Sequence, residues 1–161
     1  MTPNSLTIRD ATPADLPAII AMLADDPLGK ARETASDPVE PAYSHAFDAI
    51  VADPNQRLIV AEQHGAIVGT LQLSFLPGLS YRGAWRGQIE GVRVASDQRG
   101  SGLGTQLINW AIDLCLARDC RFVQLTTHNL RTDAHRFYDR LGFVQSHAGM
   151  KLDLSKGEQA P

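Results

Sequence analysis

A glycine-rich run late in the chain is the segment best suited to hold a ligand. It reads Gln98-Arg99-Gly100-Ser101-Gly102-Leu103-Gly104-Thr105 and lies between an expected strand and a long expected helix. Glycine at alternate positions lets the main chain turn tightly and leaves its N–H groups uncovered by side chains. Those donors stand at a helix N-terminus, where the helix dipole also favours an anion. The run therefore predicts a cradle for a phosphate or diphosphate, made by the amides of Arg99, Gly100, Ser101, Gly102, Leu103, Gly104 and Thr105.

Other kinds of glycine loop fit this run less well. A P-loop ends in Gly-Lys-Ser/Thr, and here Thr105 follows Gly104 with no lysine, which excludes that motif. A Rossmann fingerprint reads G-x-G-x-x-G near the first strand of a βαβ unit. This run reads G-x-G-x-G and follows several strands that look antiparallel. A glycine-rich connection that binds nothing stays open as the alternative.

The elements that must position this loop follow from the periodicity of the apolar residues. Strands are expected at Leu6–Arg9, Leu58–Ala61, Ile67–Leu73, Gln88–Ala95 and Phe122–Thr126, with a closing hairpin of Phe143–Ser146 and Met150–Leu154. Helices are expected at 13–25 behind an N-cap at Thr12, at Ala42–Val51, from about Gly102 onward, and at Thr132–Leu141. His64-Gly65 is typical of a hairpin turn. Because strands and helices interleave without regular alternation, the pattern predicts an α/β (α+β) fold, a mixed sheet covered by helices.

Composition narrows the class of protein. A chain of 161 residues, 43% of them hydrophobic, suits one domain with its own core. We expect that single domain to span residues 1–161, with a core from about 6 to 154 and a polar tail at 155–161. No apolar run is long enough for a membrane span, and a net charge of −3 disfavours a nucleic-acid binder. Two cysteines and the lack of a secretory signal pattern at the first residues lead us to expect a cytoplasmic protein.

Two motifs in register resemble the GNAT superfamily of acyl-CoA-dependent N-acetyltransferases. The central family signature, a strand followed by R/Q-x-x-G-x-G/A, is matched by Val92-Arg93-Val94-Ala95 and then Arg99-Gly100-Ser101-Gly102-Leu103-Gly104. The second, N…A…F-Y…G-F, is matched by Asn129, Ala134, Phe137-Tyr138 and Leu141-Gly142-Phe143. Ala95-Ser96-Asp97 departs from the family, which often has a proline there. Gly87–Glu90 and Arg131–Tyr138 look most like the aminoalkylphosphonate acetyltransferases and other small-amine enzymes.

This resemblance implies a fold and a co-substrate. The family fold is a mixed sheet of six to seven strands with splayed central parallel strands and about four helices. Its members bind acetyl-CoA between the splayed strands, and no metal is expected. By this resemblance the segment Val92, Arg93 and Val94 would bind the pantetheine through its main chain, Asn129 would line the same channel, and the glycine loop would hold the diphosphate.

The implied reaction is attack of an amine on a thioester, and it needs a base. Glu90 is the candidate, because it stands two positions before Val92 and is expected on the same face of the strand. A carboxylate is a weak base unless burial raises its pKa. An exposed strand glutamate, or an ion-pair partner of Arg86, is the alternative interpretation of Glu90.

The departing CoA thiolate needs a hydrogen-bond donor. Tyr138 matches the family tyrosine that serves that sulfur, and a tyrosine that only packs beside Phe137 is the alternative.

The acceptor would be chosen by the loops at Pro27–Pro41 and Pro77–Trp85. Tyr81, Arg82, Trp85 and Arg86 could hold a small amine that carries a carboxylate or phosphonate, or form a dimer contact or a solvated loop. The sequence thus predicts an N-acetyltransferase of a small amine, in an expected homodimer. Acetylation of a protein N-terminus or lysine is the runner-up, and a non-catalytic acyl-CoA sensor is a third alternative.

Overall fold

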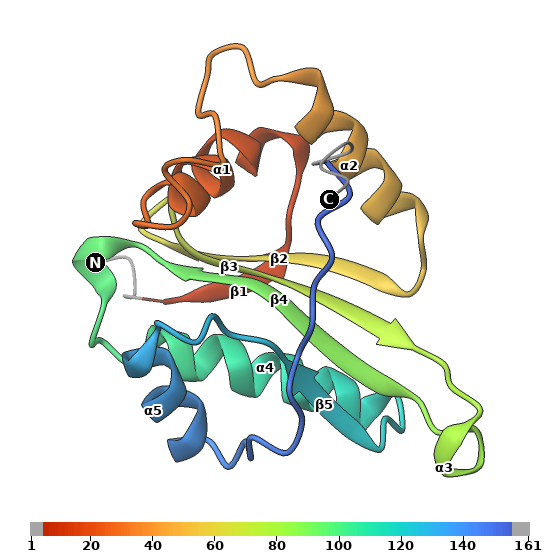
Figure 1. Cartoon of the computed structure of the whole chain (residues 1–161). Coiled ribbons are helices and arrows are strands. Elements are labelled where there is room, and N and C mark those ends of the chain that lie inside the picture. The colour runs from red at the N-terminus through yellow and green to blue at the C-terminus, as the bar shows by residue number, and fades with distance from the viewer. Residues whose placement is uncertain (1–4, 156–161) are drawn as a thin grey trace, which may run out of the picture. The chain divides into compact units, whose positions relative to one another are not determined.

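The computed structural model describes residues 5–155, which fall into two compact units (Figure 1). The first unit ends at Leu125 and the second begins at Thr126. The first holds a sheet with helices, and the described part of the second holds one helix followed by chain without regular secondary structure. Within residues 5–155, no helix has the length and apolar character needed to cross a membrane.

The sheet of the first unit has five strands in the order β1-β2-β3-β4-β5. Their bounds are β1 Thr7–Asp10, β2 Gln56–Gln63, β3 Ala66–Leu76, β4 Arg86–Val94 and β5 Phe122–Leu125. Neighbours from β1 to β4 are antiparallel, whereas β4 and β5 run parallel. The expected mixed sheet is therefore confirmed, and so is the His64-Gly65 turn between β2 and β3, where both residues have a positive φ.

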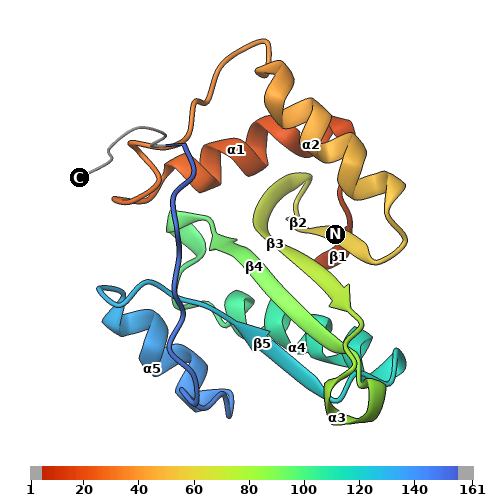
Figure 2. The ribbon, with the colours of Figure 1, turned by 45° about the vertical axis from the view of Figure 1, so that its right-hand side comes forward.

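Helices cover both faces of this sheet (Figures 1 and 2). The helices are α1 Leu16–Ala24 and α2 Pro41–Ala52 on one face, α4 Leu103–Ala117 on the other, the short α3 Ser80–Gly83, and α5 Thr132–Arg140 in the second unit. On the first face Leu58 packs against a buried cluster of Leu16, Ile20 and Phe47. On the second, Leu107 and Cys115 of α4 lie so close to Gly69 and Gly87 that a Cβ at either glycine would clash with them.

The first helical segment starts at the expected cap, Thr12, and the carboxylate of Asp15 stabilises that start. A 3-10 turn, Pro13–Asp15, precedes α1, and the Thr12 N–H donates to Asp15 Oδ2 at 2.7 Å in a capping box. Arg9 of β1 pairs with Asp15 at 2.7 Å and with Glu62 of β2 at 2.7 Å. The hydrogen bond from Arg9 lowers the pKa of the Asp15 carboxyl to about 2, although Asp15 is only 7% exposed and burial by itself raises that pKa. The network ties α1 to the first two strands.

Two expectations about the elements are wrong. The expected hairpin of Phe143–Ser146 and Met150–Leu154 is absent from the described residues, so the sheet has five strands and not six to seven. A strand forms only when a neighbour completes its ladder of hydrogen bonds, and the alternation of side chains does not specify that neighbour. The expected Pro77–Trp85 loop also contains the short α3, which makes five helices among the described residues instead of about four.

Candidate active site

The glycine-rich run forms an open set of main-chain donors before α4. Within residues 5–155, no acceptor is found for the amides of Arg99, Gly100, Gly102, Gly104 and Thr105. The Ser101 amide donates to the Gln98 carbonyl at 3.2 Å, and the Leu103 amide lies 3.4 Å from Ser101 Oγ. The run is exposed from Arg99 to Gly102, and α4 begins without a side-chain cap. These donors fit the oxygens of a diphosphate, as at other helix N-termini that bind anions.

Two glycines are required for this shape. Gly100 and Gly102 have φ values of 81° and 86°, in the left-handed region that L-residues with a Cβ avoid. A Cβ added at either position would meet no atom within 4 Å, so the requirement is conformational and not one of space.

A bulge in β4 determines which way the neighbouring side chains point. Glu90 is opposite Gln72, and Arg93 is opposite Thr70, so β4 has one more residue than β3 over this stretch. The extra residue falls at Gly91, whose φ is 62°. Directly opposed residues share a face, so Glu90 and Arg93 point to the same side of the sheet. Our expectation that Glu90 shares a face with Val92 is therefore wrong, because one inserted residue reverses the alternation.

The two parallel strands stay together over a short distance only. β5 pairs with β4 from Arg86 to Ile89. Beyond the bulge, β4 runs on to Val94 with no further strand on that side among the described residues. The main chain of Val92–Val94 is thus open on one edge, in the place where the family resemblance expects pantetheine. The Val92 carbonyl already accepts a bond from the Arg93 guanidinium at 2.8 Å.

Polar side chains accompany Glu90 on the α1 and α2 face of the sheet. Strand pairing puts Gln72 opposite Glu90 and Ser74 opposite Gln88, and Gln124 lies beside Gln88. Hydrogen bonds form a row across the strands: the Gln72 amide donates to Gln56 Oε1 at 3.1 Å, the Ser74 hydroxyl donates to Gln56 Oε1 at 2.7 Å, and the Gln124 amide donates to Gln88 Oε1 at 2.6 Å. Sequence reasoning missed this row. The alternating polar residues at 72 and 74, and at 88 and 90, were the signal that could have found it.

Two arginines contact the segment after α1, Arg93 from β4 and Arg99 from the glycine loop. Arg93 faces Asp26, 3.7 Å away and almost buried, and Asp26 Oδ2 also accepts a bond from the Gly29 amide. Arg99 lies 3.4 Å from the Asp25 carbonyl. Sequence analysis assigned both arginines to the cofactor but did not find this contact, since it joins residues more than sixty positions apart. Arg93 acts here to position the 25–29 turn.

Tyr138 and Asn129 both belong to the second unit. Tyr138 is half-buried on α5, with its ring 5.0 Å from Phe137 and 5.8 Å from Phe143 in edge-on geometry. Gly142 follows the helix with a φ of 90°, which confirms it as the residue after the C-cap. Asn129 lies exposed in the loop before α5. The family roles of Tyr138 and Asn129 stay predictions.

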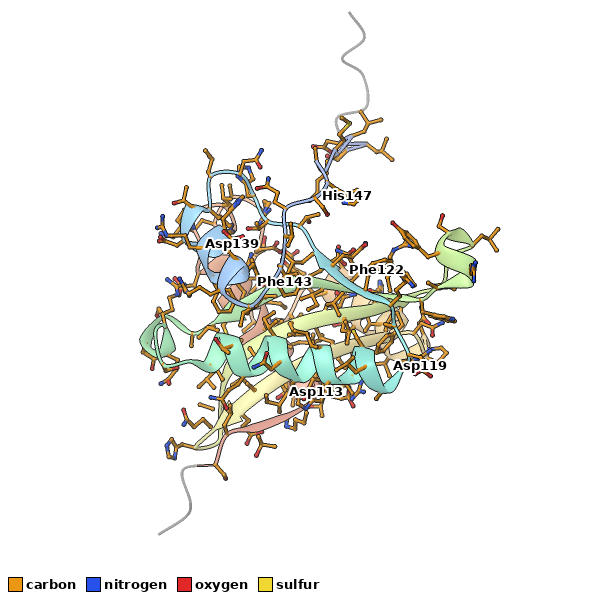
Figure 3. All side chains as sticks on the ribbon, turned by 90° about the horizontal axis from the view of Figure 1, so that it is seen from below. Asp113, Asp119, Phe122, Asp139, Phe143 and His147 are labelled. Atoms are coloured by element: carbon orange, nitrogen blue, oxygen red, sulfur yellow. The ribbon has the colours of Figure 1, made fainter. Side chains whose placement is uncertain are left out.

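Two of the four expected acceptor residues, Tyr81 and Trp85, contact the segment after α4. Tyr81 stacks edge-on with Phe122 at 4.8 Å and lies under Arg121, while Trp85 lies under Arg118 beyond the end of α4. Figure 3 shows Phe122 at the start of β5, near the turn that carries Asp119.

Backbone geometry and strand register separate the other two. Arg82, like Tyr81, is exposed with a positive φ, a conformation that costs about 1–2 kcal/mol for such residues. Of the four, only Arg86 shares the face of Glu90. It stands an even number of residues before Glu90 on β4, with its partner Leu76 the same number from Gln72 on β3, and it lies four residues or about 13 Å from Glu90 along the strand. Substrate roles for all four stay predictions.

The cysteines do not offer a nucleophile. Burial raises the pKa of Cys115 to about 12 and also raises the pKa of Cys120. Residues 5–155 contain no group of three or more His, Cys, Asp or Glu side chains that could hold a metal ion.

Comparisons with known proteins show which family the chain is similar to. The model of the acetyltransferase (GNAT) family matches residues 19–143. An aminoalkylphosphonate N-acetyltransferase from Salmonella typhimurium is 35% identical over 106 residues, 66% of this chain and 68% of that one. An L-methionine sulfoximine/L-methionine sulfone acetyltransferase from Pseudomonas paraeruginosa is 32% identical over 142 residues, 86% of this chain and 80% of that one.

Among solved structures, a transcriptional regulator from Bacillus halodurans is similar with a TM-score of 0.91. It is 49% identical, and the match covers 93% of this chain and 100% of that one.

Proposed function

This chain belongs to the GNAT acetyltransferase family, and on that premise we propose that it moves an acetyl group from acetyl-CoA to the primary amine of a small molecule. The observation that carries the proposal is the open row of amides from Arg99 to Thr105. A sensor of acyl-CoA would need those donors too, so the proposal also depends on residues that handle protons. We expect the reaction to take place in the reducing cytoplasm, which suits two free thiols.

Binding is assigned to main-chain groups. Acetyl-CoA supplies an activated acetyl thioester, and the amides before α4 would hold its diphosphate. The open edge of β4 at Val92–Val94 would bind the pantetheine, whose amides are matched to the donors and acceptors of a strand. Side chains therefore remain available for the acceptor and for chemistry.

Glu90 is assigned the role of base, directly or through one water. A primary amine with a pKa of about 10 is neutral in only about one molecule in a thousand at pH 7, so proton removal limits the attack. Glu90 is exposed on the polar face, and within residues 5–155 it has no ion pair, with Arg86 or with any other group. A carboxylate in that state can attract an ammonium and take its proton, which frees the nitrogen lone pair to attack the thioester carbonyl carbon as the bond to the CoA sulfur breaks.

Tyr138 is assigned the role of donor to the departing sulfur. A phenol is a weaker acid than a thiol by about 1.5 pKa units, so full proton transfer to the thiolate is uphill by about 2 kcal/mol. A hydrogen bond from the phenol to the developing thiolate lowers the barrier without that transfer.

The polar row beside Glu90 supports a small, hydrogen-bonding acceptor. Amides and a hydroxyl from Gln72, Ser74 and Gln88 offer neutral donors and acceptors next to the base. Both curated relatives are acetyltransferases whose names specify small amino compounds, a phosphonate in one and a sulfoximine or sulfone in the other. Protein N-terminal or lysine acetylation is the second candidate within the family.

Thiol release from acetyl-CoA across a panel of amines tests the proposal. The panel contains aminoalkylphosphonates, methionine sulfone, simple alkylamines and a lysine peptide. Turnover with small amines supports the proposed function, and turnover with the peptide alone supports the second candidate. Tight CoA binding in calorimetry without turnover of any amine would identify a sensor. Absence of CoA binding would refute the proposal as a whole.

A further inference from the structure

The guanidinium of Arg93 on β4 contacts two different segments of the chain. Its Nη1 donates to the Val92 carbonyl at 2.8 Å, within the stretch of β4 assigned to pantetheine. Its Nη2 lies 3.7 Å from Asp26 Oδ2, in the turn that follows α1. Figures 1 and 2 show the end of α1 beside this end of β4. One side chain therefore joins the strand that would hold the co-substrate to the start of the expected acceptor loop, residues 27–41.

Asp26 is the residue on which the turn after α1 is built. Its main-chain carbonyl accepts bonds from the Gly29 and Lys30 amides, both at 2.9 Å, and its Oδ2 accepts a second bond from the Gly29 amide at 3.0 Å. Gly29 lies directly against α1, since a Cβ there would come within 2.0 Å of the Leu23 carbonyl. The carboxylate that faces Arg93 is thus the same one that shapes the turn.

The two ends of the acceptor loop are held in different ways. At the far end, Tyr43 of α2 donates its hydroxyl to Glu33 Oε2 at 2.9 Å and accepts a bond from the Thr34 amide at 3.0 Å. At the near end, the Asp25 carbonyl lies 3.4 Å from the Arg99 guanidinium, and that contact is exposed. An exposed bond of this length is weak, so the position of the near end relative to the sheet depends mainly on Arg93.

The pair of Arg93 and Asp26 is shielded from water. Their side chains are only 17% and 9% exposed. Removing one partner of such a pair leaves a charge in a poorly solvated place, whereas removing both charges is often close to neutral for stability. Loss of one charge should therefore affect both the stability of the chain and the position of the turn, and loss of both charges should affect mainly the position.

We propose that Arg93 is a positioning residue for the acceptor. It holds the 25–29 turn, and with it the start of the 27–41 loop, at a fixed distance from the stretch of β4 that binds pantetheine. The inference rests on the proposed function for the identity of the two ligands. The guanidinium is engaged by the Val92 carbonyl and by Asp26, so Arg93 acts through the loop and does not touch the reacting atoms.

Steady-state kinetics separate positioning from folding. Arg93→Met and Asp26→Asn should each raise KM for the amine about 10-fold or more and change kcat little, because a displaced loop weakens acceptor binding equally in the ground state and the transition state. Arg93→Lys, which keeps the charge, should recover part of the affinity.

The Arg93→Met/Asp26→Asn double variant gives the decisive comparison. Asparagine keeps an oxygen for the Gly29 amide, and no charge is left without a partner. The double variant should regain most of the wild-type free energy of unfolding in denaturant melts but keep the raised KM. A KM that returns to the wild-type value together with stability would show that the pair is purely structural, and would overturn the proposal.

The matched control is a second arginine–aspartate pair on the same helical segment, Arg9 with Asp15 at 2.7 Å. It lies at the opposite end of α1 from the 25–29 turn. Asp15→Asn should lower the stability and leave KM for the amine unchanged. An equal rise of KM in Asp15→Asn would attribute the effect to general destabilisation and count against Arg93.

Hydrogen exchange provides a measurement that needs no turnover. The amides of Gly29, Lys30, Arg32 and Glu33 are bonded within the turn, and they should exchange about 10-fold faster in the Arg93→Met chain than in the wild type. Equal exchange in the two chains would overturn the proposal, whether or not any amine is acetylated. Faster exchange in a chain that acetylates no amine would remove the proposed function and keep Arg93 as the residue that positions the turn.

Discussion

Gly102 provides the sharpest test of the diphosphate cradle. The residue stands directly before α4 with a φ of 86°, and no atom lies within 4 Å of the position a Cβ would take. Replacement by alanine therefore introduces no clash. It only makes the left-handed conformation less favourable, by about 1–2 kcal/mol.

The effect on binding follows from that conformational cost. The free Gly102→Ala loop can relax away from the left-handed region, and CoA must restore the conformation in order to meet the amides of the loop. CoA affinity should then fall by up to the full 1–2 kcal/mol, which is about 5- to 30-fold. Pantetheine, which lacks the diphosphate, should bind Gly102→Ala as it binds the wild type.

Gly65 supplies the matched control. It has a φ of 77° in the β2–β3 turn, and a Cβ there would also meet nothing within 4 Å. Gly65→Ala should lower the free energy of unfolding by about 1–2 kcal/mol but leave CoA affinity unchanged. Calorimetric titration with CoA and with pantetheine measures both effects. Equal CoA affinity in Gly102→Ala, Gly65→Ala and wild type would refute the cradle.

Four further outcomes are expected. Glu90→Gln should lower kcat about 10²- to 10⁴-fold in thiol-release assays while leaving CoA affinity in place, and unchanged turnover would remove Glu90 as the base. Tyr138→Phe should lower kcat more than it changes the dissociation constant of CoA, and a change in that constant alone would indicate a packing role. Because the pKa of Asp15 is lowered to about 2 in the folded chain, its stabilisation of about 2 kcal/mol is complete above about pH 4 and is lost as pH falls toward 2. Denaturant melts should show this loss, and Asp15→Asn should remove this part of the pH dependence. A Cβ at Gly87 would lie 2.2 Å from Cys115 Sγ, so Gly87→Ala should cost about 1–3 kcal/mol in the same melts, and adding Cys115→Ala should restore most of it.

Local signals in the sequence predicted most of the elements well. Thr12 and Asp15 specify a helix start through bonds between neighbours, and His64-Gly65 specifies a turn through backbone preference. The glycines of the run before α4 belong to the same class, because Gly100 and Gly102 have a positive φ that the residue type itself permits. These features need no knowledge of the rest of the chain.

Features that depend on distant residues were missed. The bulge at Gly91 is visible only once β3 is placed beside β4, so the side of the sheet that Glu90 faces could not be counted from β4 alone. The pairing of Arg93 with Asp26 likewise joins two segments that only the fold brings together. The expected closing hairpin failed for a related reason, since alternation at 150–154 describes a strand but not its neighbour.

The extra residue at Gly91 also limits how this protein can change over evolutionary time. Arg86, Gln88 and Glu90 point to the polar face of the sheet because the bulge adds one residue to β4 and shifts its register with β3. Deleting a residue between Glu90 and Arg93 would turn all three toward the tightly packed interior under α4, where charges have no solvent. The polar face of β4 can therefore vary by exchange of its side chains, but not by lengthening or shortening of the strand between Glu90 and Arg93.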